Sequence, residues 1–360
     1  MSLRDIRQQE LADRWIDYGK FGIINAAPRL GKIRISLLIM EKIKPKTVLI
    51  SYPDNKIRDS WLEDFDKFGF ISPSIRFTTF LSLHKHTQEK YDLIILDECH
   101  LLSDAQIEEC KALIASQARR CVLGLTGTLS RWTAKGLSEE LSLPVVAKYS
   151  IEMAIKEGIL PDYEINVVRI PLDDRVVNDY NGKRTTEKKK FANYKWVVDK
   201  LEREEKNSFH MKLKMIGILQ SSIAKRDATI RLIEKFKDER LLVFCGRTEI
   251  ADSLGIPSYH SKSSEKDVWD DFVGGKSKHL AVVKIGNSGV TYLPLNKVII
   301  NHFDSNPETM TQRVNRCMSM EYDNPEKKAS IWIVCSTEKK EIDWLVNSLS
   351  MFDKNKIKYL

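Results

Sequence analysis

Short aliphatic runs alternate with longer amphipathic stretches along the whole 360-residue chain, and this alternation most restricts how it can fold. A strand that is apolar throughout must be buried on both faces, as in parallel sheets covered by helices on both sides. The apolar runs are residues 22–25, 47–51, 92–96 and 122–125 in the first half, and 240–245, 279–284, 297–301 and 330–334 in the second. The pattern predicts an α/β fold of two domains, each a mainly parallel sheet with helices on both faces.

The character of the sequence changes between the two halves. We predict a first domain at residues 1–165, a linker or accessory segment at 166–210, and a second domain at 211–360 with a C-terminal helical tail. The accessory segment mixes cations with aromatic residues: Tyr180, Lys183, Arg184, Lys188, Lys189, Lys190, Phe191, Tyr194, Lys195 and Trp196. Cations that track phosphates beside aromatic faces that stack on bases suit nucleic acid. A solvated helix with a few packing aromatics has the same composition.

Charge and cysteine content narrow the classes of protein further. Lys and Arg number 58 against 50 Asp and Glu, a net charge of +8 that favours a polyanionic partner without requiring one. The six cysteines have no metal-ligand spacing, so we expect reduced, buried thiols and neither a zinc site nor a disulfide framework. With no apolar run near the roughly 20 residues that span a bilayer, and no signal peptide, we expect a soluble, cytoplasmic protein without a membrane partner.

A loop ending in Gly-Lys separates the first predicted strand from a helical pattern at 34–42. Its residues are Ala27, Pro28, Arg29, Leu30, Gly31, Lys32 and Ile33. Such a loop cradles phosphates, with backbone N–H groups pointing inward and the lysine on the β- and γ-phosphates. Two letters depart from that pattern, because Arg29 stands where glycine is common and Ile33 stands where Ser or Thr ligates Mg²⁺. An ordinary strand-to-helix turn is the alternative for this segment taken alone.

Two carboxylates follow a later apolar strand and make a nucleotide site much more specific. Asp97 ends the run 93–96 and can hold Mg²⁺, while Glu98 can orient an attacking water. A third strand then ends in Thr126-Gly127-Thr128. A phosphate loop, paired acids and a polar strand end, in this order, predict a site that hydrolyses a nucleoside triphosphate.

In this order the motifs resemble those of superfamily 2 helicases and translocases, which carry them on two RecA-like domains. The loop at Lys32 is similar to motif I, residues 97–100 to the DExH form of motif II, and residues 126–128 to motif III. The resemblance implies ATP and Mg²⁺ as cofactors, with Lys32 and Glu98 catalytic, Asp97 on the metal, and residues 27–33 around the nucleotide. Leu3 and Arg4, with Gln8 or Gln9 soon after, resemble the segment that reads adenine.

The second half resembles the later motifs of the same superfamily. Residues 312–316 are similar to motif VI, so Gln312 and Arg316 are implied as catalytic, and Gly289 and Arg313 as nucleotide contacts. An arginine supplied by the second domain would neutralise charge on the γ-phosphate when the cleft between the domains closes. Ser319 stands where the family usually has another arginine.

The resemblance also implies a set of nucleic-acid contacts on both domains. In the first domain they fall on motifs Ia, Ib and III, and in the second on motifs IV and V and the loop between them. The residues are Tyr52, Pro53, Thr78, Ser82 and Thr126, then Gly246, Arg247, His260, Lys262 and Asn287.

These observations predict an ATP-dependent DNA helicase or translocase. Its small size and the passage joining the domains resemble phage helicases that remodel forks and migrate branches, which favours single-stranded or branched DNA and, for a phage protein, the host cytoplasm. One alternative is a nucleic-acid-binding protein with a decayed nucleotide site, motivated by Arg29, Ile33 and Ser319. The other is an RNA helicase.

Overall fold

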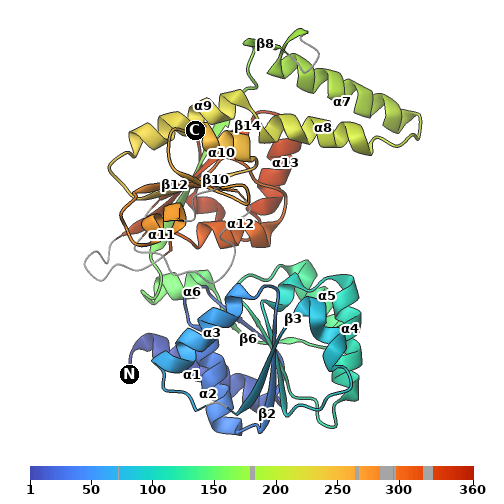
Figure 1. Ribbon diagram of the computed structural model, residues 1–360, viewed down its shortest axis with the longest axis vertical. Helices are drawn as coiled ribbons and strands as arrows, with labels where there is room; N and C mark the ends of the chain where they lie inside the picture. The colour runs from blue at the N-terminus through green and yellow to red at the C-terminus, as the bar shows by residue number, and fades with distance from the viewer. Residues whose placement is uncertain (72, 179–182, 264–266, 284–294, 296, 319–326) are drawn as a thin grey trace. The chain divides into compact units, whose positions relative to one another are not determined.

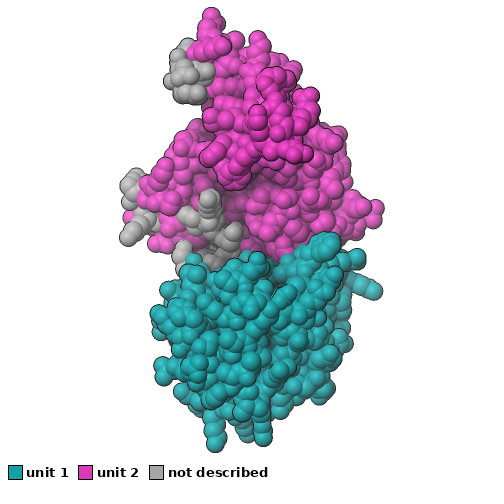
Figure 2. Space-filling view, turned by 90° about the vertical axis from the view of Figure 1, so that its right-hand side faces the viewer, with its two compact units in different colours: residues 1–160, 288–290 teal, residues 161–287, 291–360 magenta. Residues whose placement is uncertain are grey.

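The structure is a computed structural model that describes residues 1–360 except 72, 179–182, 264–266, 284–294, 296 and 319–326. The described chain forms two compact units (Figure 2). Unit 1 contains residues 1–160, and unit 2 contains the described residues from Pro161 to Leu360. Each unit is built on its own parallel sheet, as the sequence predicts.

Unit 1 is a six-stranded parallel sheet between two layers of helices (Figure 1). Helices α1 (Leu3–Asp17), α2 (Lys32–Ile43) and α3 (Lys56–Lys67) lie on one side, and α4 (Asp104–Ser116) and α5 (Arg131–Leu141) on the other. The strand order is β3-β2-β4-β5-β1-β6. The strands are β1 (Phe21–Ala26), β2 (Thr47–Tyr52), β3 (Ser74–Thr79), β4 (Leu93–Asp97), β5 (Val122–Thr126) and β6 (Val145–Tyr149), and the short helices are η1 (Phe80–His86), η2 (Cys99–Leu101) and α6 (Ile151–Lys156).

Local signals explain how unit 1 is assembled. Every residue of β4 and β5 is buried, which accounts for their uninterrupted apolar sequence. Helix α1 begins with a capping box in which Ser2 and Asp5 satisfy each other's backbone N–H groups. The Trp15 indole donates to the Gly22 carbonyl (3.0 Å), so α1 is tied to the first strand.

Unit 2 is a seven-stranded sheet in the order β11-β12-β10-β13-β14-β7-β15, and its described strand pairs are parallel. The strands are β7 (Asp162–Ile170), β10 (Leu241–Cys245), β11 (Ser258–Tyr259), β12 (His279–Val283), β13 (Lys297–Ile300), β14 (Lys328–Ser336) and β15 (Ile357–Tyr359). The helices are α9 (Ile223–Lys235), α10 (Thr248–Asp252), α11 (Asp267–Val273), α12 (Pro307–Val314), α13 (Lys339–Ser348) and η3 (Lys354–Lys356). Side chains of α9 and α10 pack on one face of this sheet.

The predicted linker at 166–210 is part of unit 2. Its first residues belong to β7, which pairs with β14 along its whole length and buries Tyr163, Ile165 and Val167. After a two-stranded ribbon, β8 (Val176–Asn178) and β9 (Arg184–Thr186), come α7 (Glu187–Arg203) and α8 (Phe209–Gln220), which lie side by side (Figure 1). The predicted C-terminal helical tail consists of α13 and the short helix η3, and it is followed by β15 at the sheet edge.

Most of the cysteines are buried, as the sequence predicts. All six cysteines are free, and all are buried except the half-buried Cys121. Among the helices of the described ranges, none is both long and apolar enough to cross a membrane.

Candidate functional site

The loop between β1 and α2 has a backbone that depends on glycine. Gly31 precedes α2 with φ of 91°, and a Cβ there would lie 2.6 Å from the Gln8 amide nitrogen. That amide donates to the Leu30 carbonyl (2.6 Å), so Gln8 supports the loop from α1. No side chain caps α2 in the described chain, which leaves the N–H groups of its first turn available to an anion.

The strand order brings the loop beside the two other predicted motifs. Because β4, β5 and β1 are adjacent and parallel, Glu98 after β4, Thr126 at the end of β5 and Lys32 after β1 lie at one edge of the sheet. The Lys32 ammonium is ion-paired with the Glu98 carboxylate. A Cβ added to Gly127 would lie 3.5 Å from Lys32 Nζ, so the glycine leaves space above this pair. The predicted lysine and acid are therefore in one site.

Electrostatics keeps both partners of this pair charged. Burial alone would lower the pKa of Lys32, but the adjacent Glu98 and Asp97 raise it above its usual value. Burial likewise opposes ionisation of Glu98, but Lys32 and His100 hold its pKa below the usual range. The side chains of Lys32 and Glu98 are still 19% and 24% exposed, so a ligand can reach them.

Asp97 is held differently from Glu98. Its Oδ2 accepts a hydrogen bond from the buried indole of Trp61 (3.0 Å), and its Oδ1 has no hydrogen-bond partner among the described residues. Burial raises the pKa of Asp97 to about 6. A buried carboxylate oxygen without a partner is suited to a cation, which would also favour the ionised form.

The residues after Lys32 offer less to a metal. Ile33 carries no oxygen, and the buried Ser36 hydroxyl donates to the Lys32 carbonyl of its own helix (3.2 Å). The described residues contain no group of three or more His, Cys, Asp and Glu that could hold a metal ion. The loop and Lys32 thus fit the phosphates of a nucleotide, and Asp97 fits Mg²⁺ as a carboxylate ligand that needs phosphate and water to complete the coordination.

The structure corrects the prediction that Thr126 contacts nucleic acid. Thr126 is completely buried, and its hydroxyl lies 2.9 Å from His100 Nδ1 and 2.9 Å from the Thr128 carbonyl. His100 Nδ1 also lies 3.4 Å from Glu98 Oε2. Thr126 and His100 therefore connect the end of β5 to Glu98 and offer no exposed surface to a polymer.

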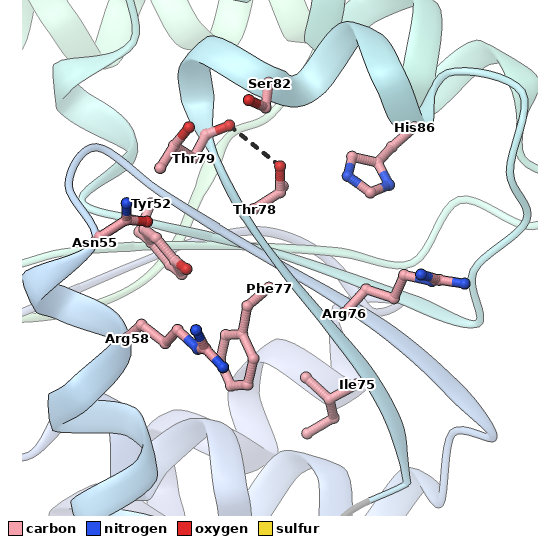
Figure 3. A pocket seen from close by; sticks show the side chains of 10 residues that line it. All are labelled: Tyr52, Asn55, Arg58, Ile75, Arg76, Phe77, Thr78, Thr79, Ser82 and His86. Carbon is pink, nitrogen blue, oxygen red and sulfur yellow. Dashed lines mark hydrogen bonds between the residues drawn. The ribbon is translucent and has the colours of Figure 1, made fainter.

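A pocket of about 530 Å³ opens where β2 and β3 end (Figure 3). Three residues predicted to contact nucleic acid, Tyr52, Thr78 and Ser82, line it, and Pro53 follows Tyr52 in the chain. Two arginines that sequence reasoning missed, Arg58 and Arg76, add positive charge. The full lining is Tyr52, Asn55, Arg58, Ile75, Arg76, Phe77, Thr78, Thr79, Ser82 and His86.

Helix α3 joins this pocket to the acidic site. Arg58 lines the pocket and lies 5.7 Å from the Phe77 ring, and one turn further Trp61 donates to Asp97. The sequence gives no spacing signal for Trp61, because a tryptophan on an amphipathic helix is usually a core residue.

In unit 2 the predicted residues cluster at the carboxyl ends of β10 and β13. Arg313 donates to the His302 carbonyl (2.6 Å), and a Cβ on Gly246 would lie 2.6 Å from the His302 ring. Arg247 is exposed, and its guanidinium lies 3.0 Å from the position a Cβ on Gly217 would occupy. Burial and the cations Lys225, Arg313 and Arg247 lower the pKa of His302 to about 2.

The other predicted residues of unit 2 have different surroundings. His260 is buried with its Nε2 2.9 Å from Asp252 Oδ1, whereas Lys262 is exposed. Gln312 lies on α12 and Arg316 just beyond it, both half-buried. Arg4 lies on α1 one turn before Gln8. Asn287, Gly289 and Ser319 lie outside the described residues.

Comparisons with protein families find one matching segment in each unit. Residues 224–321 match the helicase conserved C-terminal domain, and residues 71–131 match the type III restriction enzyme res subunit. A comparison with curated proteins found no match. Each family match covers one segment of the chain, so the matches show similarity in those two segments.

Solved structures share the two-domain RecA-like architecture, which confirms the predicted fold. The helicase domain of Hef from Pyrococcus furiosus has a TM-score of 0.51 and 11% identity, over 96% of this chain and 97% of that chain. Dbp5 from S. cerevisiae, bound to RNA and ADP BeF3, has a TM-score of 0.61 and 11% identity, over 98% of this chain and 89% of that chain. A fragment of a putative HsdR subunit of a type I restriction enzyme from Vibrio vulnificus has a TM-score of 0.62 and 17% identity, over 98% and 67%. At these identities the likeness shows a shared fold.

Proposed function

We propose that this protein is an ATP-driven translocase or helicase of the DExH type that acts on DNA, preferably single-stranded or branched. The observation that carries the proposal is the Lys32–Glu98 ion pair beside the open oxygen of Asp97, at the end of a phosphate-binding loop. Bound Mg²⁺ would supply charge neutralisation on the phosphates.

Each residue of this site has a role that follows from its position. The first-turn N–H groups of α2 and the Lys32 ammonium bind phosphate oxygens. Glu98, ionised because Lys32 and His100 lower its pKa, orients a water and accepts its proton. A phosphate that draws Lys32 away frees Glu98 for that step.

The pocket at β2 and β3 supports a nucleic-acid substrate. Arg58 and Arg76 provide the cations, and hydroxyls of Thr79 and Ser82 provide donors for phosphate oxygens. The preference for DNA over RNA rests on the resemblance to phage fork-remodelling helicases, and the RNA-bound Dbp5 structure keeps RNA as an alternative. Ile33 favours the other alternative, a binding protein whose nucleotide site no longer hydrolyses ATP.

The test measures ATP hydrolysis by the purified chain with single-stranded, duplex and branched DNA and with matched RNA. We expect hydrolysis to rise with DNA, and Arg58→Ala with Arg76→Ala to raise the DNA concentration needed for half-maximal stimulation. The matched control is Arg119→Ala with Arg120→Ala, two exposed arginines that precede β5 at the opposite edge of the sheet. Nucleic-acid binding without ATP hydrolysis would favour the alternative of a binding protein over a motor. Hydrolysis that is stimulated by RNA alone would identify RNA, and not DNA, as the substrate.

A further inference from the structure

The net positive charge of the chain is concentrated in one accessory element. Residues 183–220, which include α7 and α8, contain 11 Lys and Arg and 5 Asp and Glu, a net charge of +6 out of +8 for the whole chain. The two helices pack on each other and on Trp344 of α13 through a small core of their own, formed by Leu172, Phe191, Met215 and Leu219. The hairpin that α7 and α8 form is therefore a folded part of unit 2 and carries a strong local positive charge.

Helix α7 has two opposite faces. Residues 187, 191, 194 and 198, at helical spacing, are buried or half-buried, and they include Phe191 of the core. The stripe on the other face consists of Lys189, Asn193, Trp196, Lys200 and Arg203, all of which are exposed. This stripe contains three cations, one tryptophan and no acid, and it extends for about 21 Å at 1.5 Å per residue.

Two acids of α7 pair with lysines that lie outside the stripe. Asp199 is 2.7 Å from Lys195, and Glu202 is 2.6 Å from Lys212. Within the stripe, Lys200 lies 3.9 Å from Glu204, which is closer to Lys206 (2.9 Å), and Arg203 Nε donates to the Asp199 carbonyl (3.0 Å). Exposed contacts of this kind are weak in water. The three cations of the stripe thus remain available to an anionic partner.

Trp196 is the feature that a plain solvated helix does not explain. Its side chain is 60% exposed, and the Lys200 ammonium lies 5.6 Å from its ring centroid. Covering this exposed indole with a partner would bury its apolar area, which is favourable in water. A flat aromatic face among cations suits a polymer that offers both π-faces and phosphates, which is single-stranded nucleic acid.

We propose that the exposed stripe of α7 is a second nucleic-acid-binding surface, where a base of a single strand stacks on Trp196 and phosphates contact Lys189, Lys200 and Arg203. The proposal rests on the proposed function only for the kind of polymer involved. The contact at α7 lies outside the motor motifs, so nucleic-acid binding there does not require ATP hydrolysis.

Binding of the full chain to three fluorescent probes tests the proposal: a 20-nucleotide oligo-dT, a blunt 20-base-pair duplex, and heparin, a polyanion without bases. We expect Trp196→Ala to weaken oligo-dT binding about 5- to 150-fold, the range of one lost base stack, and to change heparin binding less than twofold. Trp196→Phe should restore most of the affinity. Trp132→Ala is the matched control, because this tryptophan in unit 1 is 83% exposed.

The triple variant Lys189→Gln, Lys200→Gln and Arg203→Gln should weaken binding of all three probes. For oligo-dT it should also lower the slope of log K against log[salt] by about 2. Its control replaces the exposed Arg231, Lys237 and Lys276 by Gln. If Trp196→Ala leaves the affinity for oligo-dT unchanged, the stacking contact is overturned. An equal loss of affinity for oligo-dT and heparin also overturns it, and would indicate an acidic protein partner. Loss of DNA-stimulated ATP hydrolysis in the Arg58→Ala variant tests the proposed motor function. It does not affect the binding test of Trp196.

Discussion

Lys32, the first residue of α2, is ion-paired with Glu98, which lies 66 positions later, just after β4. The two meet because β1 and β4 both flank β5 in a parallel sheet, so their carboxyl ends share one edge. A phosphate that approaches Lys32 competes with Glu98 for the same ammonium. The ion pair therefore links nucleotide binding to release of the carboxylate that orients water.

The first prediction removes each partner of this pair. Lys32→Ala and Glu98→Gln should each lower ATP hydrolysis by about 10²- to 10³-fold or more, because each loses a charge that acts in the transition state. Nucleic-acid binding, measured by anisotropy, should change less than twofold. The controls are Lys44→Ala and Glu63→Gln, which are exposed on the same unit. Parent rates in both variants would contradict the assignment of the site.

The second prediction concerns the hydrogen bond from Trp61 to Asp97 (3.0 Å). Trp61→Phe keeps an aromatic ring in the core and removes the donor, which is worth about 1.5–3 kcal/mol for a bond to a charged group. We expect a lower free energy of unfolding and a higher Mg²⁺ concentration for half-maximal hydrolysis, with the ATP affinity in the absence of metal unchanged. Phe65→Leu on the same helix is the packing control. An equal shift of the Mg²⁺ requirement in both variants would assign Trp61 to packing alone.

Much of the fold was predictable from local sequence. All eight apolar runs became strands, because a buried parallel strand must be apolar on both faces. The grouping of Lys32, Asp97 and Glu98 was predictable for a related reason, since each lies at or just beyond the carboxyl end of a central strand. The strand β3 and the terminal β15 were not, because both mix polar with apolar residues at a sheet edge.

Features that depend on tertiary contacts were not predictable from the sequence. Nothing in the spacing shows that Trp61 bonds to Asp97, or that Thr126 points inward to His100. The sequence set residues 166–210 apart as a linker or accessory segment, but it could not show that β7 pairs with β14, more than 150 residues later in the chain. Charge runs indicated an accessory element, and only the structure separates its exposed stripe from its packed face.

The third prediction is a pH dependence that arises from His302. Burial and the nearby cations of α9, α12 and the end of β10 lower the pKa of this imidazole to about 2, so it stays neutral when folded. The unfolded chain binds a proton near its ordinary pKa of 6.5, so stability is complete above pH 6.5 and is lost as the pH falls below it. His302→Gln should reduce the slope of unfolding free energy against pH by an amount that grows below pH 6.5 and approaches about 1.4 kcal/mol per pH unit near pH 5. An unchanged slope in urea titrations would contradict this.

The fourth prediction concerns a buried ion pair in unit 2. Lys225 on α9 pairs with Glu341 on α13, and both side chains are at most 1% exposed. Glu341 also accepts the Ser336 backbone N–H (2.7 Å). Lys225→Met should cost about 3–5 kcal/mol because it leaves a buried carboxylate unpaired. The double variant with Glu341→Gln should recover most of that loss, and additive losses in denaturant titrations would show that the pair is not coupled.

The last prediction concerns Ile33, the second residue of α2, which stands where a hydroxyl would ligate Mg²⁺. Ser36 does not replace it, since its hydroxyl bonds to the Lys32 carbonyl. Ile33→Thr introduces the missing oxygen, and Ile33→Val is the control, because valine has nearly the same shape as threonine without the oxygen. We expect Ile33→Thr to raise the DNA-stimulated hydrolysis rate several-fold and to lower the Mg²⁺ requirement, with Ile33→Val close to the parent. Equal, measurable rates in the two variants would show that other ligands hold the metal, and no hydrolysis in either would favour the binding protein with a decayed nucleotide site.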